Sequence, residues 1–302
     1  MKKSFTTSVK SELIAKDREE RDSFLAFCYG LFLFSSSFSL SSMYIKTENK
    51  ELAETYKKCA KILAGVNATM SSTKGGTFTS EIAGEEERKK IFSAFSLSGT
   101  EFTLRINRTN IDSESCYSDF LAGVFCACGM VADPKKDYHL EFAVSFHQLS
   151  KDLIKLIEDT ELDPPLGPKY VVRNYDIIIY FKGSEHIEDL LMLMGAQNSA
   201  FKLMDVKIEK NIKNRANRLK NCDSANITKT ALSGSKQAKA IRRIKNKLGF
   251  EALPEELREI AELRLNNPEM SLSELQQNLS IPISRSGVNH RLKKLEKIAE
   301  EL

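Results

Sequence analysis

The stretch that decides the fold is FLAGVFCACG, residues 120–129. It begins with Phe-Leu-Ala-Gly, continues with apolar and small residues, and closes on Gly129, shortly before Asp133 and Pro134. Because Gly123 and the alanines carry little or no side chain, a helix formed here lets a second helix approach almost backbone to backbone. The sequence therefore predicts a tightly packed helix pair with this stretch as one member.

A candidate for the other member lies upstream, in CYGLFLFSS at residues 28–36. Aligning Gly30 with Gly123 sets the two stretches 93 residues apart (123 − 30). A repeat of this kind indicates that the chain is internally duplicated.

The residues around both stretches show the same order of helical and strand-like patterns. The first copy has strand patterns at 37–46, 67–72 and 77–82, the last two around Gly75 and Gly76, and helical patterns at 49–64 and 85–95. The second copy has strand patterns at 138–146, 170–173 and 176–181, and helical patterns at 148–159 and 184–194. Each copy thus predicts the order α-β-β-α-β-β-α, a four-stranded sheet with helices on one face.

We predict an α+β chain in which an all-α domain follows the duplicated domain. The expected divisions are a lead helix at 1–22, the duplicated domain at 23–195 with copies 23–97 and 116–195, a basic helix and linker at 196–235, and a helix-turn-helix domain at 236–302. Within the third division, 198–220 has the pattern of a helix, with Phe201, Met204, Ile208, Ile212 and Leu219 on its apolar side, whereas 221–235 is polar and is predicted to be irregular.

Charge is distributed unevenly along the chain. Residues from 196 onward hold 21 Lys and Arg against 13 Asp and Glu, a net charge of +8, which leaves −4 for residues 1–195. Within 202–247 the balance is 14 basic residues against 3 acidic ones. A basic block of this size is usually a solvated face, but next to a DNA-reading motif it favours binding to nucleic acid.

That motif is predicted in residues 271–302. Ser271 and Glu274 form a capping box before a short helix, and Ile281 with Pro282 breaks it. Ser284 can cap a last helix whose apolar residues, Val288, Leu292, Leu295, Ala299 and Leu302, recur at steps of three and four. With a helix opened by Pro254, this gives three helices whose third enters the major groove. The alternative is a plain helical hairpin with a charged surface.

The last helix supplies the candidate base contacts, and basic helices before it supply candidate phosphate contacts. At the reading helix, Arg285 suits guanine and Asn289 suits adenine, while lysines suit phosphates. The candidates on this helix are Ser284, Arg285, Ser286, Asn289, His290, Lys293 and Lys294. Those on the preceding basic stretch are Lys213, Arg215, Arg218, Lys220, Arg242 and Arg243.

Two resemblances converge on these residues. The duplicated Leu-Ala-Gly helix in its αββαββα context resembles the LAGLIDADG homing endonuclease fold. The segments SFTTSVKSEL (4–13), DPKKDYHLE (133–141), GAQNSAFKLMDV (195–206), NRLKNCDSAN (217–226), LPEELREIAELRL (253–265) and SRSGVNHRLKKLEKIAEEL (284–302) resemble the WhiA family of bacterial sporulation and cell-division regulators. That family joins an endonuclease-like domain to a C-terminal helix-turn-helix, and the match covers nearly the whole chain.

The resemblance also implies a lost activity. In active homing endonucleases each Leu-Ala-Gly helix ends in a carboxylate, and the two carboxylates hold divalent metal ions that activate water. Aligned on the glycines, this chain has Ser35 and Cys128 there, and neither replaces a carboxylate around Mg²⁺. We interpret Asp119 and Asp133 as a helix cap and a turn residue. We therefore expect no catalytic residue, metal or cofactor.

The six cysteines show no CxxC pair, so we expect free thiols in a reducing compartment, and the chain is predicted to be cytoplasmic and associated with the nucleoid. The duplication supplies an internal pseudo-twofold axis, which favours a monomer.

The leading hypothesis is a sequence-specific transcriptional regulator that binds double-stranded DNA, with a protein co-regulator or RNA polymerase as a further partner. The rivals are an architectural DNA-binding protein with little base preference and a nuclease with relocated carboxylates.

Overall fold

The computed structural model describes residues 4–160 and 165–302, so the first three residues of the predicted lead helix lie outside the described residues. The chain divides into two compact units, Met1–Lys210 and Asn211–Leu302, which are treated separately below. In the described part of the chain, no helix combines the length and the apolar character needed to cross a membrane.

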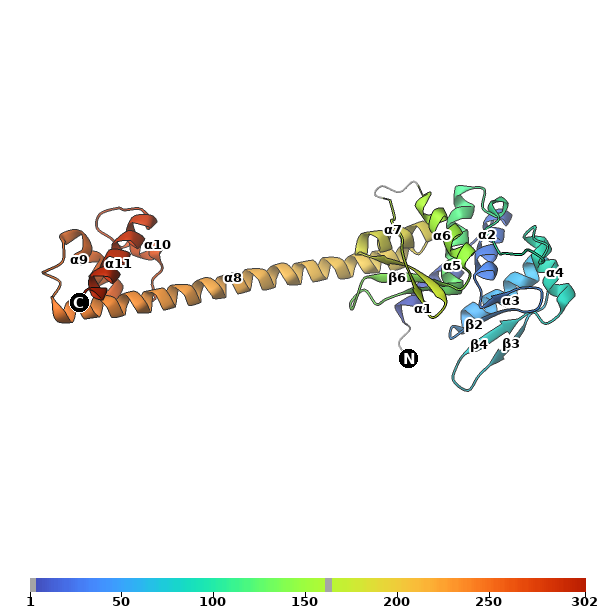
Figure 1. Ribbon diagram of the computed structural model, residues 1–302, viewed down its shortest axis with the longest axis horizontal. Coiled ribbons are helices and arrows are strands. Elements are labelled where there is room, and N and C mark those ends of the chain that lie inside the picture. The colour runs from blue at the N-terminus through green and yellow to red at the C-terminus, as the bar shows by residue number, and fades with distance from the viewer. Residues whose placement is uncertain (1–3, 161–164) are drawn as a thin grey trace. The chain divides into compact units, whose positions relative to one another are not determined.

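The first unit contains the two predicted copies (Figure 1). The first copy comprises α2 (Arg21–Leu33), β1 (Ser37–Phe38), β2 (Met43–Thr47), α3 (Lys50–Ala64), β3 (Thr69–Ser72), β4 (Phe78–Glu81) and α4 (Glu85–Ala94). The second comprises α5 (Glu114–Cys128), β5 (Gly129–Val131), β6 (His139–Val144), α6 (His147–Glu158), β7 (Lys169–Arg173), β8 (Asp176–Lys182) and α7 (Ser184–Met194). The order α-β-β-α-β-β-α is confirmed in both copies.

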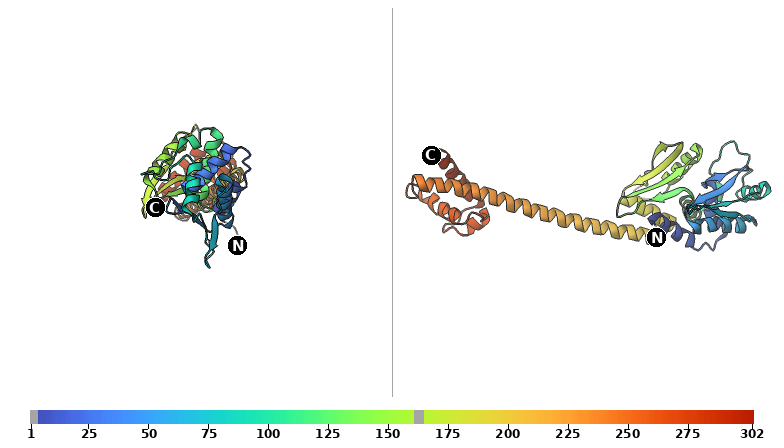
Figure 2. Two further views of the ribbon diagram at one scale, coloured as in Figure 1. Left: turned by 90° about the vertical axis from the view of Figure 1, so that its right-hand side faces the viewer. Right: turned by 90° about the horizontal axis from the view of Figure 1, so that it is seen from below.

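The two copies also share one sheet topology. The antiparallel sheets have the strand orders β1-β2-β4-β3 and β5-β6-β8-β7, and they appear as separate blue-to-teal and green-to-yellow groups of arrows in Figure 2. The single strand predicted over 37–46 is two strands, because Ser39 and Ser42 close a turn in which the Ser42 N–H donates to Ser39 Oγ at 3.0 Å. Strand β5, which follows α5 without a loop, has only three residues and no sequence signal predicted it.

Helices α2 and α5 pack against each other through their glycines. A Cβ atom on Gly30 would lie 2.2 Å from the carbonyl oxygen of Phe120, and one on Gly123 would lie 2.1 Å from that of Phe27. Neither position has room for a methyl group, so both glycines are required by the close approach of two backbones. This confirms the predicted helix pair, which forms the centre of a core shared by both copies.

The lead segment forms α1 (Phe5–Ala15), which is capped by Ser4 and buries Phe5, Val9 and Leu13. Its Glu12 carboxylate accepts hydrogen bonds from the Asn198 N–H at 2.6 Å and the Ser199 N–H at 3.0 Å. Those amides belong to the first turn of α8, where backbone N–H groups lack partners within the helix. Glu12 therefore ties the N-terminal helix to the element that follows both copies.

Helix α8 runs without interruption from Gln197 to Lys247. The prediction of an irregular linker at 221–235 was therefore wrong. The stretch is polar, but it contains no proline, and its serine and threonine side chains are accommodated by bonds such as Thr228 Oγ1 to the Ser224 carbonyl at 2.9 Å. Gly234 is placed where a Cβ would lie 1.8 Å from the Pro268 carbonyl oxygen, so close packing with the following segment selects glycine here.

The second unit is helical. The C-terminal part of α8, α9 (Glu255–Asn266), α10 (Leu272–Gln277) and α11 (Arg285–Glu300) enclose a small core that includes Ile241, Ile244, Leu257, Ile260, Leu275, Val288, Leu292 and Leu295. The buried Arg264 guanidinium organises the α9–α10 connection, because its Nη1 donates to the Met270 carbonyl at 2.6 Å and the Pro268 carbonyl at 3.1 Å.

Candidate DNA-reading helix and the ends of the helix pair

Local hydrogen bonds fix the start of α11. Ser284 caps the helix through a bond from the Gly287 N–H at 3.1 Å, and Ser271 and Glu274 form the predicted capping box at the start of α10. Between the two helices, the Ser280 N–H donates to the Glu259 carboxylate of α9 at 2.7 Å. Hydrogen bonds from the backbone and the side chain of Ser280 hold the pKa of Glu259 below its usual value. The turn is therefore anchored to the helix beneath it.

The exposed face of α11 holds the residues selected from the sequence. Val288, Leu292 and Leu295 are buried, whereas the candidates Ser284, Arg285, Ser286, His290, Lys293 and Lys294 are exposed and Asn289 is half-buried. Lys294 pairs with Glu256 of α9 at 3.1 Å. The remaining exposed candidates make this face basic, with Arg285 and Ser286 in its first turn.

The preceding basic candidates do not share one face. Lys213, Arg215, Arg218 and Lys220 are all exposed on α8, as are Arg242 and Arg243. At about 100° per residue, however, Lys213 and Lys220 project from one side of the helix while Arg215 and Arg218 project from another. A straight duplex contacting α8 can therefore meet only part of this set. The positions of the basic residues around the helix therefore decide which of them share a face, and the net charge alone does not show this.

The two positions that hold carboxylates in active homing endonucleases come together. Ser35 follows α2 and Cys128 ends α5, and both line one cavity of 230 Å³ together with Ser36, Ser145, Phe146 and neighbouring residues of both copies. None of the residues lining this cavity is Asp or Glu. Ser35 and Cys128, the two positions aligned on Gly30 and Gly123, thus lie together at the ends of the helix pair.

Neither side chain at this position carries a negative charge. The Ser35 hydroxyl donates to the Phe32 carbonyl at 2.7 Å, and the Cys128 thiol donates to the Val124 carbonyl. Burial raises the pKa of Cys128 to about 12, so the thiol is neutral at pH 7. A hard divalent cation prefers anionic oxygen ligands, which this pair does not supply.

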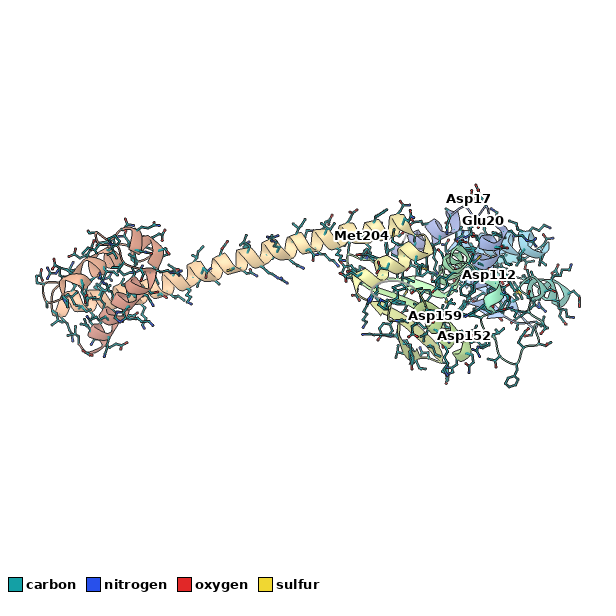
Figure 3. The ribbon with its side chains drawn as sticks, turned by 90° about the horizontal axis from the view of Figure 1, so that it is seen from above. Asp17, Glu20, Asp112, Asp152, Asp159 and Met204 are labelled. Carbon is teal, nitrogen blue, oxygen red and sulfur yellow. The ribbon has the colours of Figure 1, made fainter. Side chains whose placement is uncertain are left out.

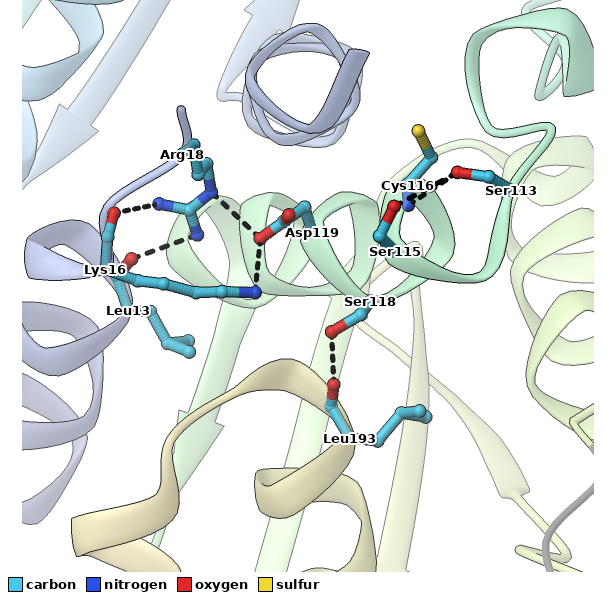
Figure 4. A network of polar contacts seen from close by, with 9 residues as sticks. All are labelled: Leu13, Lys16, Arg18, Ser113, Ser115, Cys116, Ser118, Asp119 and Leu193. Atoms are coloured by element: carbon cyan, nitrogen blue, oxygen red, sulfur yellow. Dashed lines mark hydrogen bonds and ion pairs between the residues drawn. The ribbon is translucent and has the colours of Figure 1, made fainter. Parts of the chain in front are cut away.

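Asp119 has a different role from the one predicted. The cap of α5 is Ser113, and Asp119 is buried inside the helix, where its Oδ1 accepts from Lys16 Nζ and from Arg18 Nε, each at 2.9 Å (Figure 4). The cap interpretation was wrong because the helix begins at residue 114, five residues before Asp119. Asp133 is a turn residue as predicted, with its Oδ1 accepting from the Lys135 N–H at 3.0 Å.

Arg18 is the buried partner that no sequence pattern signalled. Its guanidinium lies 3.9 Å from the centroid of the Phe27 ring and also donates to the carbonyls of Leu13 and Lys16. This one side chain therefore contacts the lead segment, α2 and α5. Asp119 therefore balances a structural cation, and it lies outside the cavity at the helix-pair ends.

Other potential ligands do not assemble. Over residues 4–160 and 165–302, no group of three or more His, Cys, Asp or Glu side chains is placed to hold a metal ion. The cysteines are free, and Cys126, two residues from Cys128, is fully buried with a pKa raised to about 12 by that burial.

Comparisons with known proteins extend these findings. Residues 216–299 match the model of the WhiA C-terminal HTH domain, and residues 117–213 match that of the WhiA LAGLIDADG-like domain. A "Probable cell division protein WhiA" from Clostridium tetani is 32% identical over 99% of this chain and 98% of its own length. A protein of the same name from Clostridium botulinum is 42% identical over 66% of this chain, a match that spans 62% of that relative's length.

Solved structures show the same fold. The crystal structure of full-length DUF199/WhiA from "Thermatoga maritima" matches with a TM-score of 0.59 at 22% identity and covers 99% of both chains. The N-terminal LAGLIDADG domain of DUF199/WhiA matches with a TM-score of 0.50 at 15% identity, over 65% of this chain and 94% of that one.

Fold and site together define a class: a degenerate LAGLIDADG-like domain, without carboxylates at its helix-pair ends, joined to a helix-turn-helix domain. Within this class, the near full-length relationship to the Clostridium tetani protein is decisive. The chain belongs to the WhiA family.

Proposed function

We propose that this protein is a sequence-specific DNA-binding regulator of bacterial cell-division and sporulation genes, acting in the cytoplasm on the nucleoid. The observation that carries the proposal is the exposed basic face of α11 inside a domain that matches a helix-turn-helix model. In this proposal Arg285 pairs with guanine and Asn289 with adenine, while Lys293 binds phosphates.

The duplicated domain acts as a non-catalytic platform in this proposal. Ser35 and Cys128 are neutral at the position where metal-dependent cleavage needs two carboxylates, and the cavity they line has no acidic residue. Residues 1–195 carry a net charge of −4, which favours a protein partner over duplex DNA for this part of the chain.

The test is selection of bound sequences from a random double-stranded DNA pool. Wild-type protein is compared with Arg285→Ala/Asn289→Ala and with a matched control, Lys74→Ala/Asn67→Ala, which removes similar residue types from exposed positions near the β3–β4 hairpin. Wild type and control should enrich one motif. The reading-helix variant should lose that motif while keeping weak, salt-sensitive binding.

Enrichment of no motif by wild type would replace the regulator by an architectural protein that binds phosphates without reading bases. Specific binding should withstand competition by random DNA about 10³-fold better than non-specific binding does. Nicking of supercoiled plasmid in the presence of Mg²⁺ would instead favour the nuclease alternative.

A further inference from the structure

Strand β7 forms an open edge of the second sheet. In the strand order β5-β6-β8-β7 it pairs with β8 on one side, and no strand of the described chain pairs with its other side. Helices α6 and α7 pack on β6 and β8, whereas all five residues of β7 are exposed. The backbone N–H and C=O groups on the free side of β7 can therefore pair with another strand.

Three consecutive residues of β7 are apolar or aromatic. Tyr170, Val171 and Val172 have exposed fractions of 65%, 51% and 67%. In the register with β8, Tyr170 and Val172 pair with the buried Ile179 and Ile177. Residues paired across strands point to the same face, so these two side chains extend the core-facing side of the sheet beyond the helices that cover it.

The same edge is polar in the first copy. Strand β3, which occupies the equivalent position in the order β1-β2-β4-β3, reads Thr-Met-Ser-Ser over Thr69–Ser72. A sheet of this topology thus forms with a polar edge strand, and the apolar side chains of β7 do not belong to the buried core. Folding does not account for these side chains, whereas contact with another molecule does.

The turn that follows β7 also presents an exposed aromatic residue. Asn174 and Tyr175 have φ values of 48° and 74°, in the left-handed region that favours glycine, and Tyr175 is 97% exposed. The corresponding turn of the first copy places Gly76 at a φ of 83°. Tyrosine is unfavourable in this conformation and gains no buried contact here, so the turn itself does not explain its aromatic ring.

Basic residues flank the apolar part of β7. Lys169 and Arg173 are exposed at its two ends, and their side chains share the face on which Val171 lies. In the described chain neither forms an ion pair, and Asp176, which is opposite Arg173, accepts from Ser145 Oγ at 2.7 Å. The free edge is therefore locally basic, although this part of the chain is acidic overall.

A second copy of the same strand does not complement this edge. If two β7 strands paired antiparallel over all five residues, Val171 would meet its counterpart and Lys169 would meet Arg173 at both ends. Like charges placed directly opposite each other destabilise a strand pair. A strand that complements both ends instead carries acidic residues there.

We propose that the free edge of β7 binds an extended segment of a partner protein as a fifth strand of the second sheet. The residues opposite Lys169 and Arg173 are acidic, and those opposite Tyr170 and Val172 are apolar. The segment thus has the five-residue pattern acidic, apolar, any residue, apolar, acidic, which reads the same in both strand directions. The inference rests on the role of the duplicated domain as a platform for a protein partner, and it specifies the chemistry of that partner.

Selection of short random peptides displayed on phage, with the full-length chain immobilised, tests the proposal. Wild type should enrich the five-residue pattern. Lys169→Glu/Arg173→Glu should enrich the same pattern with Lys or Arg in place of the acidic residues, because the charge at both ends of the edge is reversed. The selection contains no DNA, so its outcome is independent of whether α11 reads bases.

The affinity of one selected peptide is then measured by isothermal titration calorimetry. Val172→Ser should weaken it by at least about 10-fold, because an apolar contact on the core-facing side is lost. Ile62→Ser is the matched control, since it removes an apolar residue of similar exposure from α3, and it should leave the affinity unchanged. Urea denaturation of both variants checks that the domain remains folded.

Backbone pairing is tested by changing the peptide instead of the protein. A strand turns the N–H groups of alternate residues toward the same neighbour. N-methyl groups on one alternate set of peptide residues should therefore abolish binding to wild type, whereas N-methyl groups on the other set should leave it intact.

Enrichment of no pattern by wild type would overturn the proposal. So would a selected peptide that binds Val172→Ser as tightly as wild type, or one that tolerates both sets of N-methyl groups equally. If no peptide is selected but Lys169→Glu/Arg173→Glu lowers the affinity for random duplex DNA, the edge binds nucleic acid instead. If wild type sediments as a dimer that Val172→Ser dissociates, the occupant is a second copy.

Discussion

Gly30 of α2 and Gly123 of α5 occupy equivalent positions, because each packs against the carbonyl oxygen of the residue three places before the other glycine. Gly30 meets Phe120 and Gly123 meets Phe27. A Cβ atom on Gly30 would also lie 2.9 Å from the amide nitrogen of Val124, and one on Gly123 would lie 2.8 Å from that of Leu31. The contact is thus reciprocal, as a pseudo-twofold axis between two copies requires.

Gly30→Ala should destabilise the protein by about 3 kcal/mol, because the added methyl group would overlap backbone atoms that cannot rotate away. Gly123→Ala should cost a similar amount by symmetry. Urea denaturation measures both effects. Gly75→Ala is the control, since a Cβ there meets nothing closer than 3.8 Å; a loss equal to that of the control would contradict the close approach.

Asp119→Asn should destabilise the protein by about 3 kcal/mol, because Arg18 stays buried without its counter-charge. Thermal or urea unfolding gives the value. Asp133→Asn makes the same change at a turn, where the amide oxygen can still accept from the Lys135 N–H, and should be nearly neutral. If Asp119→Asn were as stable as Asp133→Asn, the ion pair in Figure 4 would not stabilise the fold.

The ion pair between Arg105 and Asp152 should make the free energy of unfolding depend on pH in the acidic range. Burial raises the pKa of Asp152, whereas hydrogen bonds from the Arg105 guanidinium and the Ile106 N–H lower it. Together the hydrogen bonds have the larger effect, so the pKa of Asp152 lies below its usual value. A carboxyl with a depressed folded-state pKa stabilises the fold above its unfolded-state pKa, and this stabilisation is lost as the pH falls through the folded-state pKa.

Asp152→Asn should therefore lower the free energy of unfolding by about 1 kcal/mol at pH 7, a modest amount because Arg105 is largely exposed. The difference from wild type should shrink below about pH 4. Urea melts across this pH range test the sign. Asp152 and Asp159, which pairs with Arg108, are labelled in Figure 3; a difference that grew at low pH would contradict the assignment.

Glu12→Ala should loosen the start of α8, since the carboxylate accepts from the first backbone amides of that helix. A lost cap of this kind costs about 1 kcal/mol. Hydrogen exchange at the Asn198 and Ser199 amides should become faster, while exchange in α11 stays unchanged. Glu19→Ala, a change in the same segment away from these amides, serves as the reference and should leave both amides protected.

Lys293→Ala should weaken DNA binding about equally for all sequences and reduce the slope of log K against log salt by about 1, because one phosphate contact is removed. Arg285→Ala should instead reduce the preference for one base. Fluorescence anisotropy at several salt concentrations separates the two effects. An unchanged slope for Lys293→Ala would place that lysine away from the phosphates.

The long helix α8 shows where sequence patterns reach their limit. Local propensity marks 221–235 as polar and poor in apolar residues, and that pattern predicts a loop. The helix forms because nothing in the segment breaks it and because both of its ends are fixed, by Glu12 at the start and by the packing of Gly234, Ile241 and Ile244 near the end. Tertiary contacts near the two ends of α8 therefore outweighed the low helix propensity of residues 221–235.

The sequence by itself determined the duplication, the helix pair and the helix-turn-helix, because glycine spacing, capping residues and apolar periodicity are local and leave a readable pattern. Only the tertiary structure decided that Ser35 and Cys128 line one cavity, that Asp119 neutralises Arg18 and that the predicted apolar side of α8 is left largely exposed. These relationships join residues about 100 positions apart or depend on what covers a surface. No local pattern carries that information, since it arises only when segments distant in the sequence are brought together in the fold.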